Sequence, residues 1–105
     1  MRQLYVYYNE IKAGTLTERV PGEEYSFLYD VNYLASDLPP VSLTLPKQNE
    51  DFLSKSLFPF FVNMLPEGAN RRMICNKYKI DETDFFGLLS VMANKDVIGA
   101  INIRK

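Results

Sequence analysis

Histidine is absent from the 105-residue sequence, and Cys75 is its only thiol. Zinc sites in proteins are built mainly from cysteine and histidine, so a structural or hydrolytic zinc site is excluded. The same absence excludes nucleophilic catalysis by Ser–His or Cys–His pairs. A single cysteine cannot form a disulfide within the chain, which fits the reducing cytoplasm. We therefore expect a cytoplasmic protein that holds neither a metal nor a cofactor.

Long apolar runs are also missing. No segment approaches the roughly 18 consecutive apolar residues that a transmembrane helix requires. The apolar run near the N-terminus is too short and too rich in tyrosine for a signal peptide. Because 12 basic and 13 acidic side chains give a net charge of −1, the chain lacks the broad positive surface that attracts nucleic acid. We expect no direct binding to membranes or to nucleic acid.

Alternating apolar residues predict strands in the first half of the chain and at its end. Asn9-Glu10 and Pro21-Gly22 are turn signals that separate the first three strands. Gly14, inside the second strand, marks a bulge or a close approach of another backbone. The predicted strands cover residues 2–9, 11–17, 25–29, 41–45 and 97–103.

A helical period replaces the alternation from residue 52 onward. Leu57, Phe61 and Leu65 share one stripe of a predicted helix over 57–65, and Pro59 is tolerated there only in the first turn. Two further helices are expected over 69–79 and 85–92, and a short one over 31–36 follows the third strand. The expected N-caps are Asp30, then Ser54 or Ser56, and finally Thr83 or Asp81.

The order of these elements predicts an α+β fold. We expect a small antiparallel sheet of about five strands, open or barrel-like, with about three packed helices. The length is that of a single domain over residues 1–105, and 47% hydrophobic with 24% charged residues is the balance of a globular domain. A chain of this size buries roughly two thirds of its unfolded surface, which is enough for one core.

The acidic residues do not form a recognisable catalytic pair. Carboxylates occur as chain neighbours at Glu23-Glu24, Glu50-Asp51 and Asp81-Glu82. Glycosidase-type chemistry needs carboxylates that face each other across a cleft, whereas neighbours in turns are solvated charges and caps. Asp84-Phe85-Phe86-Gly87 is one residue longer than the Asp-Phe-Gly motif of kinases and lies in a predicted helix, so its aromatics are expected in the core. We expect no catalytic residues and no enzymatic activity.

A basic segment follows the predicted helix over 57–65. Between Gly68 and Ile80 there are four cations and no anion, and arginine forks bind carboxylate or phosphate at two points. A solvated helix face is the simpler explanation of the charge alone, because surface charges are common without a binding role. The candidate partner contacts are Leu65, Pro66, Glu67, Gly68, Ala69, Asn70, Arg71 and Arg72. We expect that replacing both arginines with glutamate weakens partner binding and leaves folding intact.

The aromatic content is larger than one small core needs. Seven tyrosines and seven phenylalanines make up 13% of the chain. Exposed aromatic patches mark protein interfaces, and Tyr5, Tyr7 and Tyr33 are the candidates for such a patch. A helix that lies across the same face is the alternative explanation.

Several of these segments occur together, in this order, in one known family. They are Val6 and Ala13-Gly14-Thr15-Leu16, Phe27-Leu28-Tyr29, Tyr33-Leu34, Val41-Ser42-Leu43-Thr44-Leu45-Pro46, Phe60-Phe61-Val62-Asn63-Met64-Leu65-Pro66-Glu67-Gly68, Asp84-Phe85-Phe86-Gly87-Leu88-Leu89 and Ile98-Gly99-Ala100-Ile101. The Leu-Pro strand end and the phenylalanine-rich segment that runs into Leu-Pro-Glu-Gly are together specific. Through them the chain resembles, over nearly its whole length, the N-terminal subdomain of the HipA family of toxin kinases.

The resemblance implies that the catalytic machinery lies on another polypeptide. HipA kinases continue beyond this subdomain into a phosphate loop and a catalytic core, which this sequence does not contain. A stand-alone version is similar to HipS, the small antitoxin of split HipBST toxin–antitoxin systems, whose kinase HipT lacks this subdomain. The other interpretation of the length is a fragment excised from a longer kinase.

The implied function is that of an antitoxin that binds and inhibits a HipT- or HipA-like serine/threonine kinase. The complex can also include a helix-turn-helix protein similar to HipB. One alternative is an accessory lobe that completes or activates a split kinase, and another is a module that homodimerises through its aromatic face. Segment 65–72 is the feature best placed to reach a phosphate-binding cleft, although Glu67 could instead pair with a partner cation. No large aromatic follows Gly68, so inhibition by a wedged ring from that turn is not expected.

Overall fold

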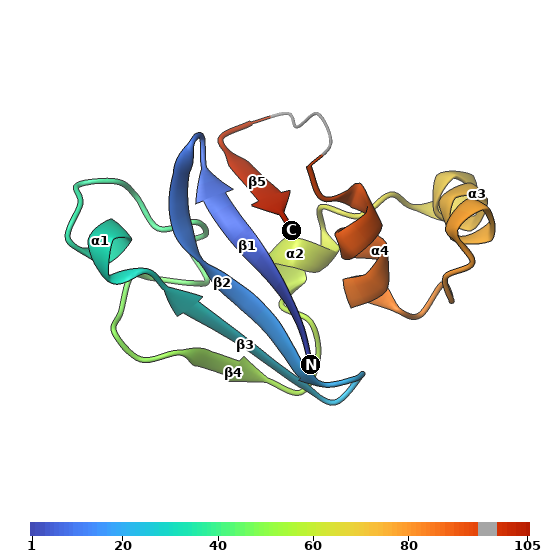
Figure 1. Cartoon of the computed structure of the whole chain (residues 1–105), viewed down its shortest axis with the longest axis horizontal. Coiled ribbons are helices and arrows are strands. Elements are labelled where there is room, and N and C mark those ends of the chain that lie inside the picture. Colours follow the sequence, from blue (N-terminus) through green and yellow to red (C-terminus); the bar gives the residue numbers. More distant parts are fainter. Residues whose placement is uncertain (95–98) are drawn as a thin grey trace.

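Five antiparallel strands form one sheet in the order β4-β3-β2-β1-β5 (Figure 1). The computed structural model describes residues 1–94 and 99–105. The strands are β1 (Arg2–Tyr8), β2 (Ile11–Val20), β3 (Glu24–Tyr29), β4 (Phe52–Ser54) and β5 (Ile101–Arg104). Strands β4 and β5 are the two edges, so the sheet is open and not a barrel. The predicted α+β fold with a small antiparallel sheet is confirmed.

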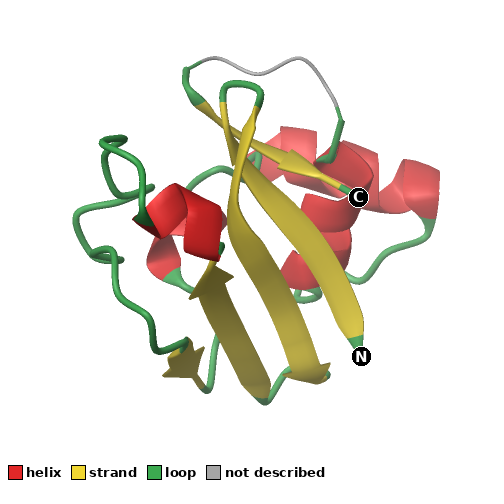
Figure 2. Ribbon diagram, turned by 60° about the vertical axis from the view of Figure 1, so that its left-hand side comes forward, coloured by secondary structure: helices red, strands yellow, loops and turns green. Residues whose placement is uncertain are grey.

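The described residues contain four helices, which leave most of one sheet face uncovered. They are α1 (Val31–Leu34), α2 (Pro59–Val62), α3 (Gly68–Tyr78) and α4 (Phe85–Met92). Helices α2 and α4 lie against the same face of the sheet, and α1 lies beside the end of β3 (Figures 1 and 2). Helix α3 lies beyond α4, at the periphery of the molecule (Figure 1).

The hairpin between β1 and β2 forms as the sequence predicts. Asn9 adopts a φ of 51°, which asparagine tolerates better than most residues, and this reverses the chain. The register shifts by one residue after the pair Val6 and Gly14, which is a bulge. A Cβ atom at Gly14 would lie 2.5 Å from the carbonyl oxygen of Leu28, so this strand approaches β3 too closely for any side chain. Both explanations offered for Gly14 are therefore correct.

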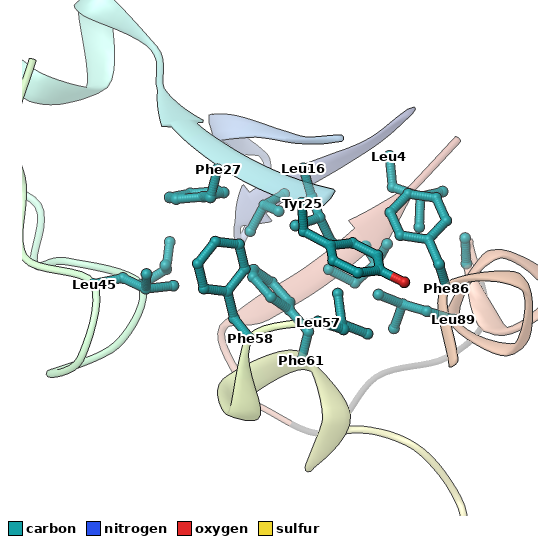
Figure 3. Packing of buried hydrophobic residues seen from close by; sticks show 14 of the residues in the cluster. Leu4, Leu16, Tyr25, Phe27, Leu45, Leu57, Phe58, Phe61, Phe86 and Leu89 are labelled. Atoms are coloured by element: carbon teal, nitrogen blue, oxygen red, sulfur yellow. The ribbon is translucent and has the colours of Figure 1, made fainter. Parts of the chain in front are cut away.

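The core lies between the sheet and the helices α2 and α4. Tyr25, Phe27 and Tyr29 point from β3 into this layer and are buried, as their alternation predicts. Phe61 from α2 and Phe86 from α4 meet them from the other side (Figure 3). Other members of the cluster include Leu4, Leu16, Leu45, Leu57, Phe58 and Leu89 (Figure 3). One aromatic-rich core therefore fixes the helices on the sheet.

The predicted strand over 41–45 is wrong. Residues 42 and 45 form only an isolated bridge, and Leu43 is 96% exposed. The hydroxyl of Tyr29 accepts a hydrogen bond of 3.0 Å from the amide of Val41 and donates one to the carbonyl of Leu45, which closes this segment into a loop. The strand that pairs with β3 is instead β4, at residues 52–54, where the sequence pattern predicts the start of a helical period.

The helices differ from their predictions mainly at their ends. Helix α2 covers only 59–62 of the predicted 57–65, with Pro59 in its first turn as expected and Phe58, not a serine, at the N-cap. Helix α1 ends at residue 34 and receives no side-chain hydrogen bond from Asp30. Helix α4 is capped by Asp84, not by Thr83 or Asp81. The last strand begins at residue 101; of its predicted start, residues 97 and 98 lie outside the described residues.

Candidate partner-binding surface

Helix α3 carries the basic segment that the sequence singles out. Cys75 is its buried residue and Ile74 is half-buried, and this side of the helix packs on α4. The helix ends at Tyr78, and its C-cap Lys79 adopts a left-handed φ of 59°. The amide of Ile80 then donates a 2.9 Å hydrogen bond back to the carbonyl of Cys75. Helix α3 is thus attached along one side and exposed along the other.

Arg71 belongs to the attached side of α3. Its Nε donates a 2.9 Å hydrogen bond to the carbonyl of Pro66, and its guanidinium carbon lies 5.3 Å from the ring centroid of Phe85 in α4. A charged hydrogen bond and a cation–π contact together join the preceding loop, α3 and α4. The structure therefore argues against the expectation that Arg71 can be reversed in charge without consequence for folding.

The exposed side of α3 forms a continuous strip, which we call the outer face of α3. Its members are Ala69, Arg72, Met73, Asn76 and Lys77. Arg72 has no hydrogen bond or ion pair with any described residue, and Met73 is 64% exposed. The sequence pattern marks Lys77 among the cations of this segment but misses Met73, which is exposed beside Arg72 on the same helix face. The spacing of three, four, seven and eight residues from Ala69 would have placed them on one helix face.

The segment that leads into α3 is mixed in exposure. Leu65 is buried in the core and Pro66 is half-buried, so these two anchor the segment. Glu67 and Asn70 are exposed, as are the two small residues between them, Gly68 and Ala69. Gly68 has a φ of 57°, which explains why glycine occupies the entry to the helix. Of the predicted contacts in 65–72, those from Glu67 to Asn70 and Arg72 are accessible, and their role in binding stays a prediction.

Tyr5 and Tyr7 lie on the sheet face opposite the core, where cations cover them. The Lys12 ammonium is 4.6 Å from the Tyr5 ring centroid, and the Arg104 guanidinium carbon is 4.0 Å from that of Tyr7. Arg104 also forms a 3.0 Å ion pair with Glu10. Both rings are half-buried. The face is therefore covered by charged side chains and not by a helix, which was the alternative explanation.

Tyr33 does not belong to that patch, and the prediction of its exposure is wrong. Its side chain is 1% exposed. Its ring stacks on Tyr29 at a centroid distance of 5.8 Å, and its hydroxyl donates a hydrogen bond to the carbonyl of Pro39. Tyr33 therefore helps to hold the loop over 35–47, and it has almost no surface to offer a partner.

A polar network that the sequence did not reveal ties the sheet to α4. Arg2 donates hydrogen bonds to Glu18 (Nε to Oε1, 2.7 Å) and to Asp84 (Nη2 to Oδ1, 2.8 Å). Tyr25 donates a 3.0 Å hydrogen bond to the second Glu18 oxygen. Asp84 also accepts from the amide of Gly87, where a Cβ atom would lie 2.2 Å from the carboxylate. The glycine of the Asp-Phe-Phe-Gly motif thus makes room for a helix cap.

The ionisation states within this network follow from its contacts. Hydrogen bonding from Arg2 holds the pKa of Asp84 below its ordinary value, and the amide of Gly87 lowers it further. Burial raises the pKa of Tyr25, and the hydrogen bond to Glu18 adds to the rise. Asp84 is therefore ionised and Tyr25 protonated at neutral pH, and Arg2 lies in ion pairs with both Glu18 and Asp84. The network therefore acts as a structural clamp, to which we refer as the Arg2 clamp.

Substitution of Asp84 is expected to make stability less sensitive to acid. A carboxylate whose pKa is lower in the folded chain contributes stability above its unfolded pKa and loses it as the pH falls through the folded value. We expect Asp84→Asn to reduce the free energy of unfolding at pH 7 by about 1 kcal/mol, because the group is one-third exposed. The difference from the natural chain should shrink below about pH 4.

Urea unfolding at pH 7 and at about pH 3 measures this difference. Asp37→Asn serves as the control, because Asp37 is exposed and makes no hydrogen bond or ion pair with the described residues. A difference between the Asp84 variant and the natural chain that is as large in acid as at pH 7 would contradict the assignment.

Other kinds of site find no support in the described part of the chain. Across residues 1–94 and 99–105, histidine, cysteine, aspartate and glutamate nowhere gather in the threes that could hold a metal ion. Over the same ranges, none of the helices has the length and apolar character needed to span a bilayer. What the structure does present is a folded unit with a basic, partly apolar helix face.

An open five-stranded antiparallel sheet with a helical layer on one side defines a small α+β domain. The sequence profile of the HipA N-terminal domain matches residues 4–104, so the chain belongs to the HipA N-terminal domain family. A solved structure described as the N-terminal domain of HipA toxin superposes with a TM-score of 0.69 at 28% identity, covering 99% of this chain and 92% of that one. The expected resemblance is therefore confirmed.

Two relatives show the domain in different settings. A protein of Haemophilus influenzae is 31% identical over 81 residues, which are 77% of this chain and 73% of that protein. A Sinorhizobium fredii protein named "Putative kinase Y4mE" is 29% identical over 104 residues, which are 98% of this chain and 24% of Y4mE. The same unit thus makes up most of one relative and about a quarter of another.

Proposed function

We propose that this protein is an antitoxin that binds a HipA-like serine/threonine kinase in the cytoplasm and suppresses its activity. The observation that carries the proposal is the pair of settings in which the domain occurs. In Y4mE the matched region is 24% of a longer chain named as a kinase, whereas in the Haemophilus protein it is 73%. The domain therefore occurs as part of a chain named as a kinase and also as most of a much shorter protein. A domain found in both forms is suited to bind a kinase that is a separate chain.

The chain's own chemistry supports binding over catalysis. Histidine is absent from the sequence, and the carboxylates of the Arg2 clamp are used internally, because Arg2 donates hydrogen bonds to both Glu18 and Asp84. None of these carboxylates is free to act as a base. What remains for function is surface, and the outer face of α3 carries unpaired positive charge at Arg72.

The test is a kinase assay with a HipA-like kinase that lacks this N-terminal domain. We expect autophosphorylation and target phosphorylation to fall as this protein is added, and to reach a floor at one equivalent. A rise on addition would contradict the antitoxin function and favour an accessory lobe that activates a split kinase. Size-exclusion chromatography of the mixture shows whether the two chains form a complex, and whether a helix-turn-helix protein similar to HipB joins it. A persistent homodimer that ignores the kinase would favour the dimerisation module.

A further inference from the structure

We propose that the outer face of α3 is the surface that recognises the kinase, and that it docks on an apolar pocket surrounded by carboxylates. Met73 enters the pocket, and Arg72 pairs with the carboxylates, while Lys77, one helical turn beyond Met73, adds positive charge to the same face. This inference rests on the proposed function, because it names the chemistry of the partner surface. It also moves the contact away from Arg71 and the tyrosines, keeps Arg72 and adds Met73, which the sequence pattern did not mark.

The first argument is which cations are still available. Most cations among the described residues are bound to groups of their own chain: Arg2, Lys12, Arg19, Lys47, Arg71, Lys77 and Arg104 each have an ion pair, a hydrogen bond or an aromatic ring as partner. Arg72 has none of these within residues 1–94 and 99–105. An unpaired guanidinium on a helix that contains no carboxylate of its own fits a partner that supplies one.

The second argument is the position of Met73 beside that arginine. An exposed methionine flanked by cations combines an adaptable apolar side chain with charge, and both methionine and arginine are enriched in protein interfaces. Met73 is 64% exposed, so about two thirds of the apolar gain from burying it is still available to a partner. Met73 has Arg72 before it and Lys77 one helical turn after it, and the sequence from Gly68 to Ile80 contains no acidic residue. The pocket that receives Met73 is therefore next to positive charge.

The third argument is that α3 is presented as a rigid, outward element. Arg71 links it to Pro66 and Phe85, and Cys75 anchors its inner side. The helix lies beyond α4, away from the sheet (Figures 1 and 2). A preformed helix face loses little conformational entropy on binding, which favours its use as a docking element.

The experiment measures affinity for the kinase by calorimetry with four matched single variants. Met73→Asp and Arg72→Glu alter the outer face of α3. Leu53→Asp and Lys55→Glu are the controls, because Leu53 is 61% exposed on β4 and Lys55 is an exposed cation next to it, without an ion pair among the described residues. Leu53→Asp matches Met73→Asp, because both place a carboxylate at an exposed apolar position. Lys55→Glu matches Arg72→Glu, because both reverse the charge of an exposed cation. Thermal melts of all four check that folding is kept.

We expect Met73→Asp and Arg72→Glu each to weaken binding about tenfold or more, and the two controls to change it by no more than about twofold. Affinity of the natural chain should fall with added salt, and Arg72→Glu should flatten that dependence. Equal affinities for all five proteins would overturn the inference and leave the proposed function standing. Loss with Met73→Asp alone would overturn the acidic chemistry of the pocket. If the natural chain does not bind the kinase, it is the proposed function that fails.

Discussion

Replacing Phe61 with alanine is expected to lower the free energy of unfolding by about 3–5 kcal/mol. The Phe61 side chain is 0% exposed, and three aromatic rings surround it, with centroid distances of 5.9 Å to Phe27, 6.3 Å to Phe58 and 5.2 Å to Phe60. Its removal leaves a cavity between β3 and the short helix α2, which has only one turn and cannot close over the gap without losing its own contacts.

Phe60 offers a matched control in the same helix. It is half-buried and packs on the edge of the core, so Phe60→Ala should cost about 1–2 kcal/mol. Urea unfolding measures both variants, and Phe61→Leu, with an expected loss of about 1–2 kcal/mol, keeps the comparison possible if the alanine variant is largely unfolded. Similar losses for Phe60→Ala and Phe61→Ala would contradict the central position assigned to Phe61.

The first three strands could be predicted because their determinants are local. The turn at Asn9, the turn at Pro21-Gly22 and the aromatic alternation over 25–29 each decide the structure within a few residues. Gly14 was recognisable for the same reason, since a glycine inside a strand pattern has few explanations. The close approach of Leu28 to Gly14 then gives the physical cause.

The loop at 41–45 shows where a local pattern misleads. Val41 and Leu45 are both buried, as a strand pattern requires, but what holds them is the hydroxyl of Tyr29, 12 and 16 residues away in sequence. Two anchors with an exposed Leu43 between them produce the same alternation as a strand. Pairing with the sheet depends on a partner edge, and β4 at 52–54 occupies the edge of β3. Alternation alone does not distinguish these two arrangements.

The candidate surface was only partly predictable, for a similar reason. Arg71 and Arg72 are chain neighbours with the same side chain, and only the packing of α3 on α4 decides which of them stacks on Phe85 and which faces solvent. Tyr33 illustrates the opposite error, because a tyrosine after the third strand carries no sign of the loop that buries it. The residue types alone indicated that this segment could contact a partner. Which of its residues are accessible depends on the side of the helix on which each one lies.

The Arg2 clamp could not be predicted at all, and its loss should have the second large effect. Arg2 and Asp84 are 82 residues apart in sequence. We expect Arg2→Met to lower the free energy of unfolding by about 2–4 kcal/mol, because it leaves the Glu18 carboxylate, which is 1% exposed, with Tyr25 as its remaining hydrogen-bond partner. The effect stays below that of a fully buried pair because the Arg2 side chain is 40% exposed.

The cause can be isolated with a second substitution. If the cost comes from an unpaired buried charge, Arg2→Met combined with Glu18→Gln should be more stable than Arg2→Met alone, since the neutral amide does not need a cation. Urea unfolding of the single and double variants at pH 7 measures this recovery. A double variant that is less stable than Arg2→Met would show that the cost arises instead from the contacts of Arg2 with Asp84 and the Phe86 ring. In either case α4, which supports α3, depends on a residue at the opposite end of the chain.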